Sequence, residues 1–179
     1  TNKNMNGGTA KIRIKGNPII RTGSIGGGTT KSLGGKIGSA DIQIEGGDIQ
    51  AQFIMAAGSA VEPKFVMTGG VIRDSNVDDS EYSHISRNGG AVYMENGSFT
   101  MTGGTLHGVD TADNSKFNYA QQNGAAVYMD DPNGVVSISG GTIKDCSAVN
   151  GGAIYMSDGT CTISGNAVIE SCVASENGG

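Results

Sequence analysis

The sequence predicts an all-β fold, a parallel β-helix (solenoid) of about six coils with two long loop insertions. Three observations predict it: one short phrase recurs, apolar residues alternate within each phrase, and glycine is abundant. The 179 residues include 31 glycines but only 3 prolines and no tryptophan, whereas a typical glycine content is about 7%. Abundant glycine indicates many tight turns, and the lack of a strict third-residue period excludes collagen.

The first repeated phrase is NGGAVYM at residues 88–94. It returns as NGAAVYM at 123–129 and as NGGAIYM at 150–156, and the sequence stops on NGG. A second template, apolar-x-apolar-x followed by Gly-Gly or Gly-Asn, defines six units. These units start at Ile12, Ile42, Phe65, Phe99, Val136 and Cys161. Repetition of this kind is typical of solenoids.

The local period within each phrase is two, which predicts strands. Val92 and Met94 are expected to point into the core and Tyr93 outward. A unit of two or three short strands cannot bury its own apolar side, so we expect units to stack about 4.8 Å apart. Val92, Val127 and Ile154 should then lie over one another.

The unit starts lie between 23 and 37 residues apart, and the differences fall in loops. The two longest insertions, residues 73–87 and 107–122, stand at corresponding places in consecutive units. Insertions into solenoids collect on one face. We therefore expect the two loops to lie beside each other.

The rhythm N-G-G-A-[VI]-Y-M followed by F-T-M-T-G-G-T-[LI] resembles the β-helical repeat regions of large bacterial adhesin-like cell-surface proteins. It is also distantly similar to the GGA-[ILV] repeats of chlamydial polymorphic outer-membrane proteins. The resemblance covers residues 34–179 well and 1–33 loosely. It implies a right-handed β-helix, export to the bacterial surface or secretion, and a stalk or binding role. It carries no catalytic residue.

Charge is distributed unevenly. Residues 1–40 carry seven basic side chains and no acidic one, while residues 41–179 carry five basic and 17 acidic. The ordinary interpretation is two solvated ends of a long molecule. A basic patch for nucleic acid is the alternative, but the aromatic residues expected of single-strand binding are missing there. We expect no nucleic-acid partner.

No apolar run approaches the ~20 residues of a membrane helix, and any export signal is expected outside the segment.

Nine residues are candidates for partner binding. Three tyrosines occupy equivalent outward positions of the phrase and are expected to stack, either as a platform for a sugar or protein or as simple cross-strand stabilisation. The long loops supply aromatic and acidic residues, and loops on a rigid scaffold are where binding residues concentrate. The candidates are Tyr93, Tyr128 and Tyr155 in the phrase, Asp78, Asp79, Tyr82 and His84 in the first loop, and Phe117 and Tyr119 in the second.

Other chemistries are less well supported. Paired loop carboxylates suit glycoside hydrolysis or calcium, but solvated charge is the default for such loops. The two histidines, His84 and His107, have no ligand-like spacing, so we expect no metal and no cofactor. Outward Thr and Ser residues such as Thr100 and Thr102 raise ice binding as an alternative, although Ser replaces Thr repeatedly.

Three cysteines exclude a zinc ribbon and argue against a disulfide scaffold. Cys161 takes the inward place of Phe99 and Val136, which predicts a small core residue. Cys146 and Cys172 occupy matching turn positions in successive units. Stacking would bring their Cα atoms within the range that a disulfide allows, with stacked free thiols as the expected state.

We predict a non-enzymatic binding segment of a bacterial surface adhesin, comprising residues 1–179 of a longer repeat-containing protein. Its expected partner is a host glycoprotein, mucin or immunoglobulin, bound by a monomer that does not insert into a membrane. The alternatives are a carbohydrate-active β-helix enzyme, which would need carboxylates clustered in a groove, and a passive spacer.

Overall fold

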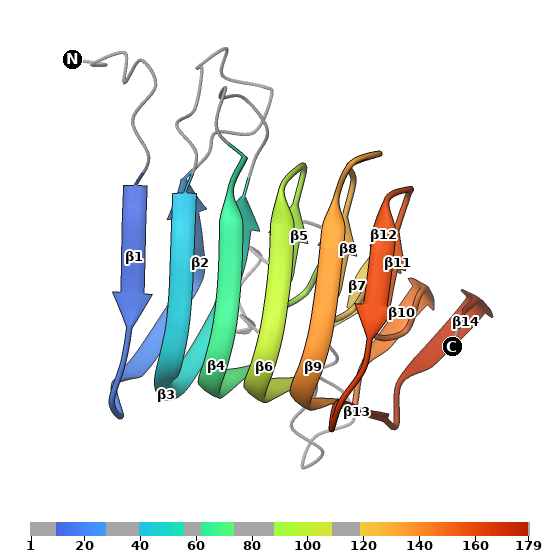
Figure 1. Ribbon diagram of the computed structural model, residues 1–179. Helices are drawn as coiled ribbons and strands as arrows, with labels where there is room; N and C mark the ends of the chain where they lie inside the picture. The colour runs from blue at the N-terminus through green and yellow to red at the C-terminus, as the bar shows by residue number, and fades with distance from the viewer. Residues whose placement is uncertain (1–9, 28–39, 56–61, 74–87, 109–118, 179) are drawn as a thin grey trace.

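The protein is all-β in a computed structural model that describes residues 10–27, 40–55, 62–73, 88–108 and 119–178, and this part of the chain contains no helix (Figure 1). The strands are β1 (Ala10–Ile14), β2 (Ile19–Gly27), β3 (Ala40–Met55), β4 (Lys64–Arg73), β5 (Val92–Met94), β6 (Ser98–His107), β7 (Tyr119–Asn123), β8 (Val127–Met129), β9 (Val135–Lys144), β10 (Ser147–Asn150), β11 (Ile154–Met156), β12 (Thr160–Ile163), β13 (Val168–Glu170) and β14 (Val173–Asn177).

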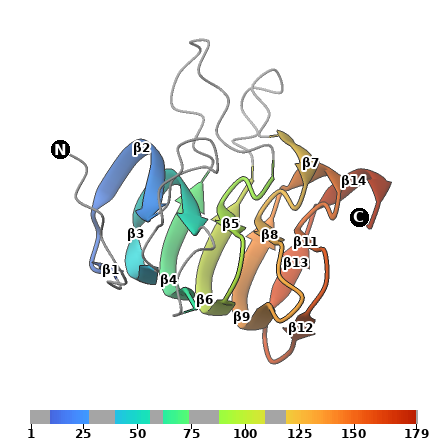
Figure 2. The ribbon, with the colours of Figure 1, turned by 90° about the horizontal axis from the view of Figure 1, so that it is seen from above.

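Every strand pairing is parallel. The larger sheet has 11 strands, and a smaller sheet has the order β14-β10-β7. The larger sheet curves round the core, so that β5, β8 and β11 lie across from β4, β6 and β9 (Figure 2). Partners are a whole repeat unit apart in the sequence, which is why nearly all the pairing is long range.

The six predicted unit starts lie in one continuous register. Ile12 pairs with Ile42, Ile42 with Phe65, and the series continues through Phe99 and Val136 to Cys161. The predicted column of Val92, Val127 and Ile154 is also present. The prediction that matching phrases stack is confirmed.

Side chains alternate between core and surface as the period of two predicts. In β6, Phe99 and Met101 are fully buried, whereas Thr100 is partly exposed and Thr102 exposed. Phe65 packs between Phe53 and Phe99, with ring centroids 5.2 and 5.3 Å away. A single apolar core therefore runs through successive units.

The Gly-Gly pair bends each long strand at the same place. Gly104 has a φ of +87°, which favours glycine. Gly103 has no such requirement, but a Cβ added there would lie 2.5 Å from the Thr68 carbonyl oxygen of the preceding unit. The first glycine thus permits close stacking and the second permits the turn.

The asparagine that opens the NGG phrase forms a ladder of side-chain amides. The Asn123 side chain donates to Asn88 at 3.2 Å, Asn150 donates to Asn123 at 2.9 Å, and Asn177 donates to Asn150 at 2.8 Å. At the start of the ladder, the buried Gln52 amide donates to the Asn88 and Gly89 carbonyls. The Asn123 and Asn150 amides each donate one of these bonds and accept another, so the ladder ties consecutive units together.

Replacing Asn123 by alanine is expected to lower the free energy of unfolding by about 1–3 kcal/mol, since partly buried partners on both sides lose a hydrogen bond. Asn177→Ala is the matched control. It removes only the bond to Asn150 at an exposed position, and its effect should stay below about 1 kcal/mol. Urea denaturation followed by tyrosine fluorescence measures both, and equal losses would contradict the ladder.

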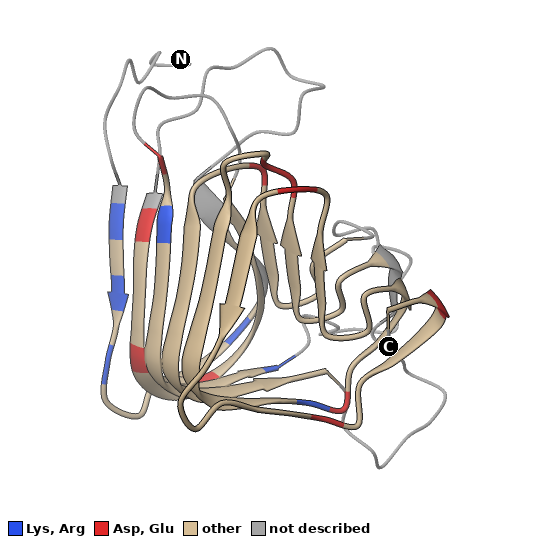
Figure 3. Cartoon of the chain, turned by 45° about the vertical axis from the view of Figure 1, so that its right-hand side comes forward, with Lys and Arg blue, Asp and Glu red and all other residues tan. Residues whose placement is uncertain are grey.

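Basic side chains of the first unit pair with acidic side chains of the second. Lys11 stands beside Asp41 in the β1–β3 register. The Arg13 guanidinium contacts the Glu45 carboxylate at 2.6 Å. Figure 3 shows blue residues of β1 next to red residues of β3. Arg13 and Arg21, two of the seven basic residues at this end, thus form ion pairs with acidic residues of the next unit.

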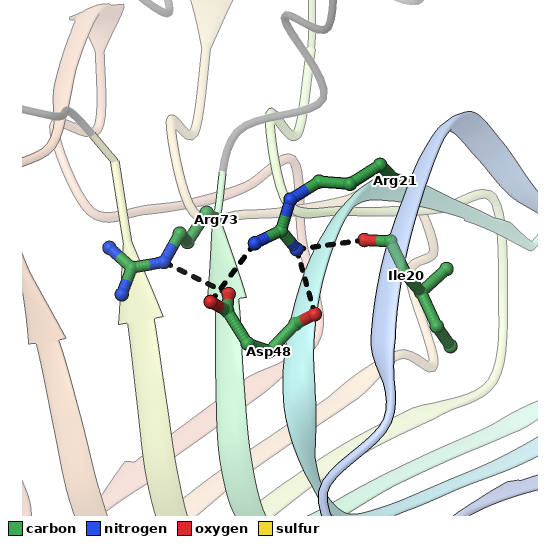
Figure 4. A network of polar contacts seen from close by, with 4 residues as sticks. All are labelled: Ile20, Arg21, Asp48 and Arg73. Carbon is green, nitrogen blue, oxygen red and sulfur yellow. Dashed lines mark hydrogen bonds and ion pairs between the residues drawn. The ribbon is translucent and has the colours of Figure 1, made fainter.

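Asp48 is held between two arginines from the units on either side (Figure 4). Arg21 donates to its carboxylate and its carbonyl oxygen at 3.0 and 2.8 Å, and Arg73 donates to the carboxylate at 3.0 Å. Burial by itself raises the pKa of Asp48, but the hydrogen bonds and charges of the two arginines outweigh it, so the pKa lies below its usual 3.8.

The lowered pKa predicts a loss of stability in acid. The unfolded chain binds a proton at Asp48 more readily than the folded chain does, so this stabilisation is complete above pH 3.8 and is lost as pH falls through the lowered pKa. Unfolding experiments should show Asp48→Asn to be destabilising near neutrality, with the difference from wild type shrinking as pH falls below 3.8. In an Arg21→Gln, Arg73→Gln background that pH-dependent difference should be absent; if it persists, the arginines are not its cause.

Core-type side chains of the last unit are exposed. Ile163 and Ile169 are 51% and 38% exposed, although their register partners Ile138 and Ile143 are buried. Cys161 pairs with Val136 as predicted but is exposed. The prediction that Cys161 is a core residue is therefore wrong, because no described unit covers it.

Candidate functional site

The three tyrosines of the repeated phrase form a stacked column on β5, β8 and β11. They are adjacent in register. The rings of Tyr93 and Tyr128 lie 5.2 Å apart with an interplanar angle of 9°, and those of Tyr128 and Tyr155 lie 5.6 Å apart at 5°. The predicted stacking is confirmed, and its cause is the parallel register.

Stacking leaves the ring edges as the outer surface of the column. Both faces of the Tyr128 ring lie against tyrosines, and only 8% of this residue is exposed. The expectation of an aromatic platform therefore does not hold for Tyr128, because a sugar stacks on ring faces, which are already occupied. The outward groups are hydroxyls and ring edges.

Carboxylates stand beside two of the hydroxyls. The Tyr93 hydroxyl donates to Glu95 at 3.3 Å, and Asp130 stands beside Tyr128 at the equivalent place. Burial, then the neighbouring carboxylates, raise the pKa of both tyrosines above 10. The hydroxyls thus stay protonated at neutral pH. We name this row of Tyr93, Glu95, Tyr128, Asp130 and Tyr155 the tyrosine–acid column.

Both long insertions are attached at neighbouring positions of the sheet. Arg73 and His107, which begin them, are paired, and Asn88 and Asn123, which follow them, form a parallel bridge. Asn88 precedes Tyr93 by only five residues. The attachment points of the loops are therefore adjacent, and one set lies close to the tyrosine–acid column.

The loop candidates themselves fall largely outside the described residues. Asp78, Asp79, Tyr82, His84 and Phe117 are not described. Tyr119 begins β7, where its backbone pairs with Ser147. The structure thus brings together the three tyrosines of the phrase. The prediction that Tyr119 lies in the second loop is wrong, because it begins strand β7 of the smaller sheet.

His107 belongs to a small charged cluster on the face formed by β6 and β9. Its Nε2 lies 3.2 Å from the Asp145 carboxylate, which Lys144 also contacts at 3.4 Å. Among the described residues, no group of three or more His, Cys, Asp or Glu side chains is arranged to hold a metal ion. Nor does this part of the chain include a helix long and apolar enough to cross a membrane.

The Thr and Ser residues considered for ice binding also align. Thr100, Ser137 and Thr162 are neighbours in register, but Val66 and Gln43 continue the same column. The column is therefore mixed in chemistry and irregular along its length.

Sequence reasoning missed the carboxylates and the amide ladder. Glu95 and Asp130 follow their tyrosines by two residues, on the same side of the strand, and this spacing was the available signal. The asparagine that begins each copy of the repeated phrase was the sequence signal for the amide ladder. Comparison of the chain with protein-family models, with curated proteins and with solved structures gave no match.

Proposed function

We propose that the chain is a right-handed parallel β-helix of about six coils that serves as a non-enzymatic binding segment of a bacterial surface or secreted adhesin. Its partner is a host glycoprotein, mucin or immunoglobulin. The β-helix is supported by the exclusively parallel pairing and by the continuous register of the six unit starts.

One observation favours binding over a passive spacer: the attachment points of both long insertions are adjacent and adjoin the tyrosine–acid column. A passive spacer needs columns of buried side chains and solvated outward side chains, but it does not need its insertions to lie next to one another. Tyrosine is enriched at protein interfaces because it combines apolar area, rigidity and a hydroxyl.

Each part of this surface has a separate role. Loop aromatics such as Tyr82 and Phe117 supply apolar contact area to the partner, which is where affinity concentrates. Glu95 and Asp130 give the column a negative potential, which orients a partner and raises its association rate. Partner binding by this route decreases as salt concentration rises.

The enzymatic alternative requires carboxylates that converge in a groove. Of the outward carboxylates of the described column, Glu95 accepts a hydrogen bond from the Tyr93 hydroxyl and Asp130 stands beside Tyr128. They directly follow the adjacent strands β5 and β8 and are exposed or partly exposed. This arrangement favours a polar contact surface.

The test is direct binding of the purified chain to mucin, immunoglobulin and a panel of host glycoproteins. Trimming both insertions to the length of residues 144–149 should weaken binding at least about ten-fold, since loop aromatics carry the affinity. Replacing Tyr93, Tyr128 and Tyr155 together by phenylalanine keeps the stacking but removes the hydroxyls, and should weaken it several-fold.

The matched control replaces Thr100, Ser137 and Thr162 by alanine, on a different column of the same units. Circular dichroism of each variant checks that the strands remain. Unchanged binding after both the loop and tyrosine changes would overturn the proposed surface. An intact chain that binds no host ligand would point to the passive spacer instead.

A further inference from the structure

Two cysteines occupy the same turn of consecutive units. Lys144 pairs with Glu170 and Ser147 with Val173, so the two residues between each pair, including Cys146 and Cys172, are held side by side. The Val173 N–H donates to the Cys146 carbonyl at 2.8 Å. Paired parallel strands lie about 4.8 Å apart, which is within the Cα separation of about 4.4–6.8 Å that a disulfide spans.

The backbone of this turn is strained in both units. Asp145 and Ser171, which precede the two cysteines, have φ values of +54° and +53°, and they are the non-glycine residues of the described chain with positive φ. Such conformations persist only where surrounding structure imposes them. At the corresponding place one unit earlier stands Gly108, where a Cβ would lie 3.1 Å from the Cys146 sulfur.

The two thiols differ in environment. Cys146 is 2% exposed, whereas Cys172 is partly exposed. The Cys146 thiol donates to the Lys144 carbonyl at 3.2 Å, and the Cys172 thiol donates to the Glu170 carbonyl at 3.3 Å. The neighbouring Cys146 side chain, and then the Cys146 backbone, lower the pKa of Cys172 to about 7 despite burial and the nearby Asp145. The same pairing and burial raise the pKa of Cys146.

Cys172 also borders an open hollow of about 500 Å³ at the exposed end of the last unit. Ile154, Met156 and Ile169 give this hollow an apolar lining, and Cys161 lies in it as well. A disulfide-bearing molecule thus has access to the Cys172 sulfur from solvent, while Cys146 lies behind it.

We propose that Cys146 and Cys172 form a thiol–disulfide exchange site that takes a low-molecular-weight disulfide as its substrate. The Cys172 thiolate attacks one sulfur of that disulfide, forming a mixed disulfide and releasing one thiolate. Cys146 loses its proton and attacks the Cys172 sulfur, which forms the Cys146–Cys172 bond and releases the second thiol. Two cysteines are oxidised and one disulfide is reduced to two thiols.

The product would join the last unit covalently to the unit before it. Attack is most effective when the thiol pKa is near the ambient pH, which Cys172 satisfies. The resolving thiol must then be adjacent and otherwise unreactive, as the buried Cys146 is. The lone exposed thiol, Cys161, has no such neighbour in the register, since its paired residue is Val136.

Oxidised glutathione is the probe for this site. The folded chain is incubated with it at neutral pH, quenched in acid, alkylated, digested and mapped by mass spectrometry. We expect a Cys146–Cys172 linkage with the loss of two of the three thiols and about 2 Da of mass. The linkage should form at least about ten-fold faster than a glutathione adduct at Cys161. The Cys161→Ser variant is the matched control and should form it at the wild-type rate.

Cys146→Ser should instead accumulate a stable glutathione adduct at Cys172, and Cys172→Ser should form no linkage at Cys146. Circular dichroism verifies that each serine variant is folded, and the wild-type chain in urea should lose the preference for this pair. A persistent adduct at Cys172 in the wild type would overturn the proposal. Linkage of Cys161 as often as Cys146, or no faster reaction in the folded than in the unfolded chain, would overturn it equally.

Discussion

Gly124→Ala is expected to lower the free energy of unfolding by about 3–5 kcal/mol. Gly124 has a φ of +62° in the second position of the NG phrase. An added Cβ would overlap the Val127 carbonyl oxygen and lie 3.0 Å from the Tyr155 N–H nitrogen of the next unit. Neither neighbour is a flexible side-chain end, so two stacked units must move apart.

The control for this substitution is Gly16→Ala. Gly16 has a similar φ of +75°, but a Cβ there meets nothing within 4 Å. It should therefore show the conformational cost alone, about 1–2 kcal/mol. Urea denaturation followed by far-ultraviolet circular dichroism gives both values. Equal losses would mean that close stacking at Gly124 contributes nothing.

Phe65→Ala is expected to cost about 3–5 kcal/mol. Phe65 is fully buried and contacts Phe53 and Phe99, which belong to neighbouring units or to the opposite wall. Its removal takes away apolar area and leaves a cavity that rigid parallel strands cannot close. Denaturation midpoints with tyrosine fluorescence measure the loss.

The matched control is Ile19→Ala on β2, where the side chain is 75% exposed. Its effect should stay within about 0.5 kcal/mol. Phe65→Leu adds a graded test, with an expected loss between those of the other two variants. A cost below about 1 kcal/mol for Phe65→Ala would show that the core tolerates a cavity at its centre.

The stacking of repeats was predictable from the sequence because two local signals agree. A period of two fixes which residues point inward, and the glycine pair fixes where each strand bends. The pairing of Phe65 with Phe99 and of Val92 with Val127 follows from these signals alone. The strand Ile19–Gly27 was not predicted, because its residues match the repeated phrases loosely.

The properties of the site depended on contacts that spacing does not encode. Register predicts that Tyr93 and Tyr128 are adjacent, but how much of each ring remains exposed depends on the packing of neighbours. The exposure of Cys161 likewise results from its place in the last unit. The position of a residue within the repeat predicts whether its side chain points inward or outward. The position of its unit along the stack decides how much of that side chain is buried.

The exposed end of the last unit has a thermodynamic consequence. In a linear array each unit is stabilised by the neighbours that it touches, so a unit with one neighbour is the least stable. Ile163 and Ile169 have apolar surface in water that their counterparts Ile138 and Ile143 bury. Within these 179 residues, strands β12, β13 and β14 should therefore unfold before β6 and β9, and a covalent bond between Cys146 and Cys172 would oppose this local unfolding.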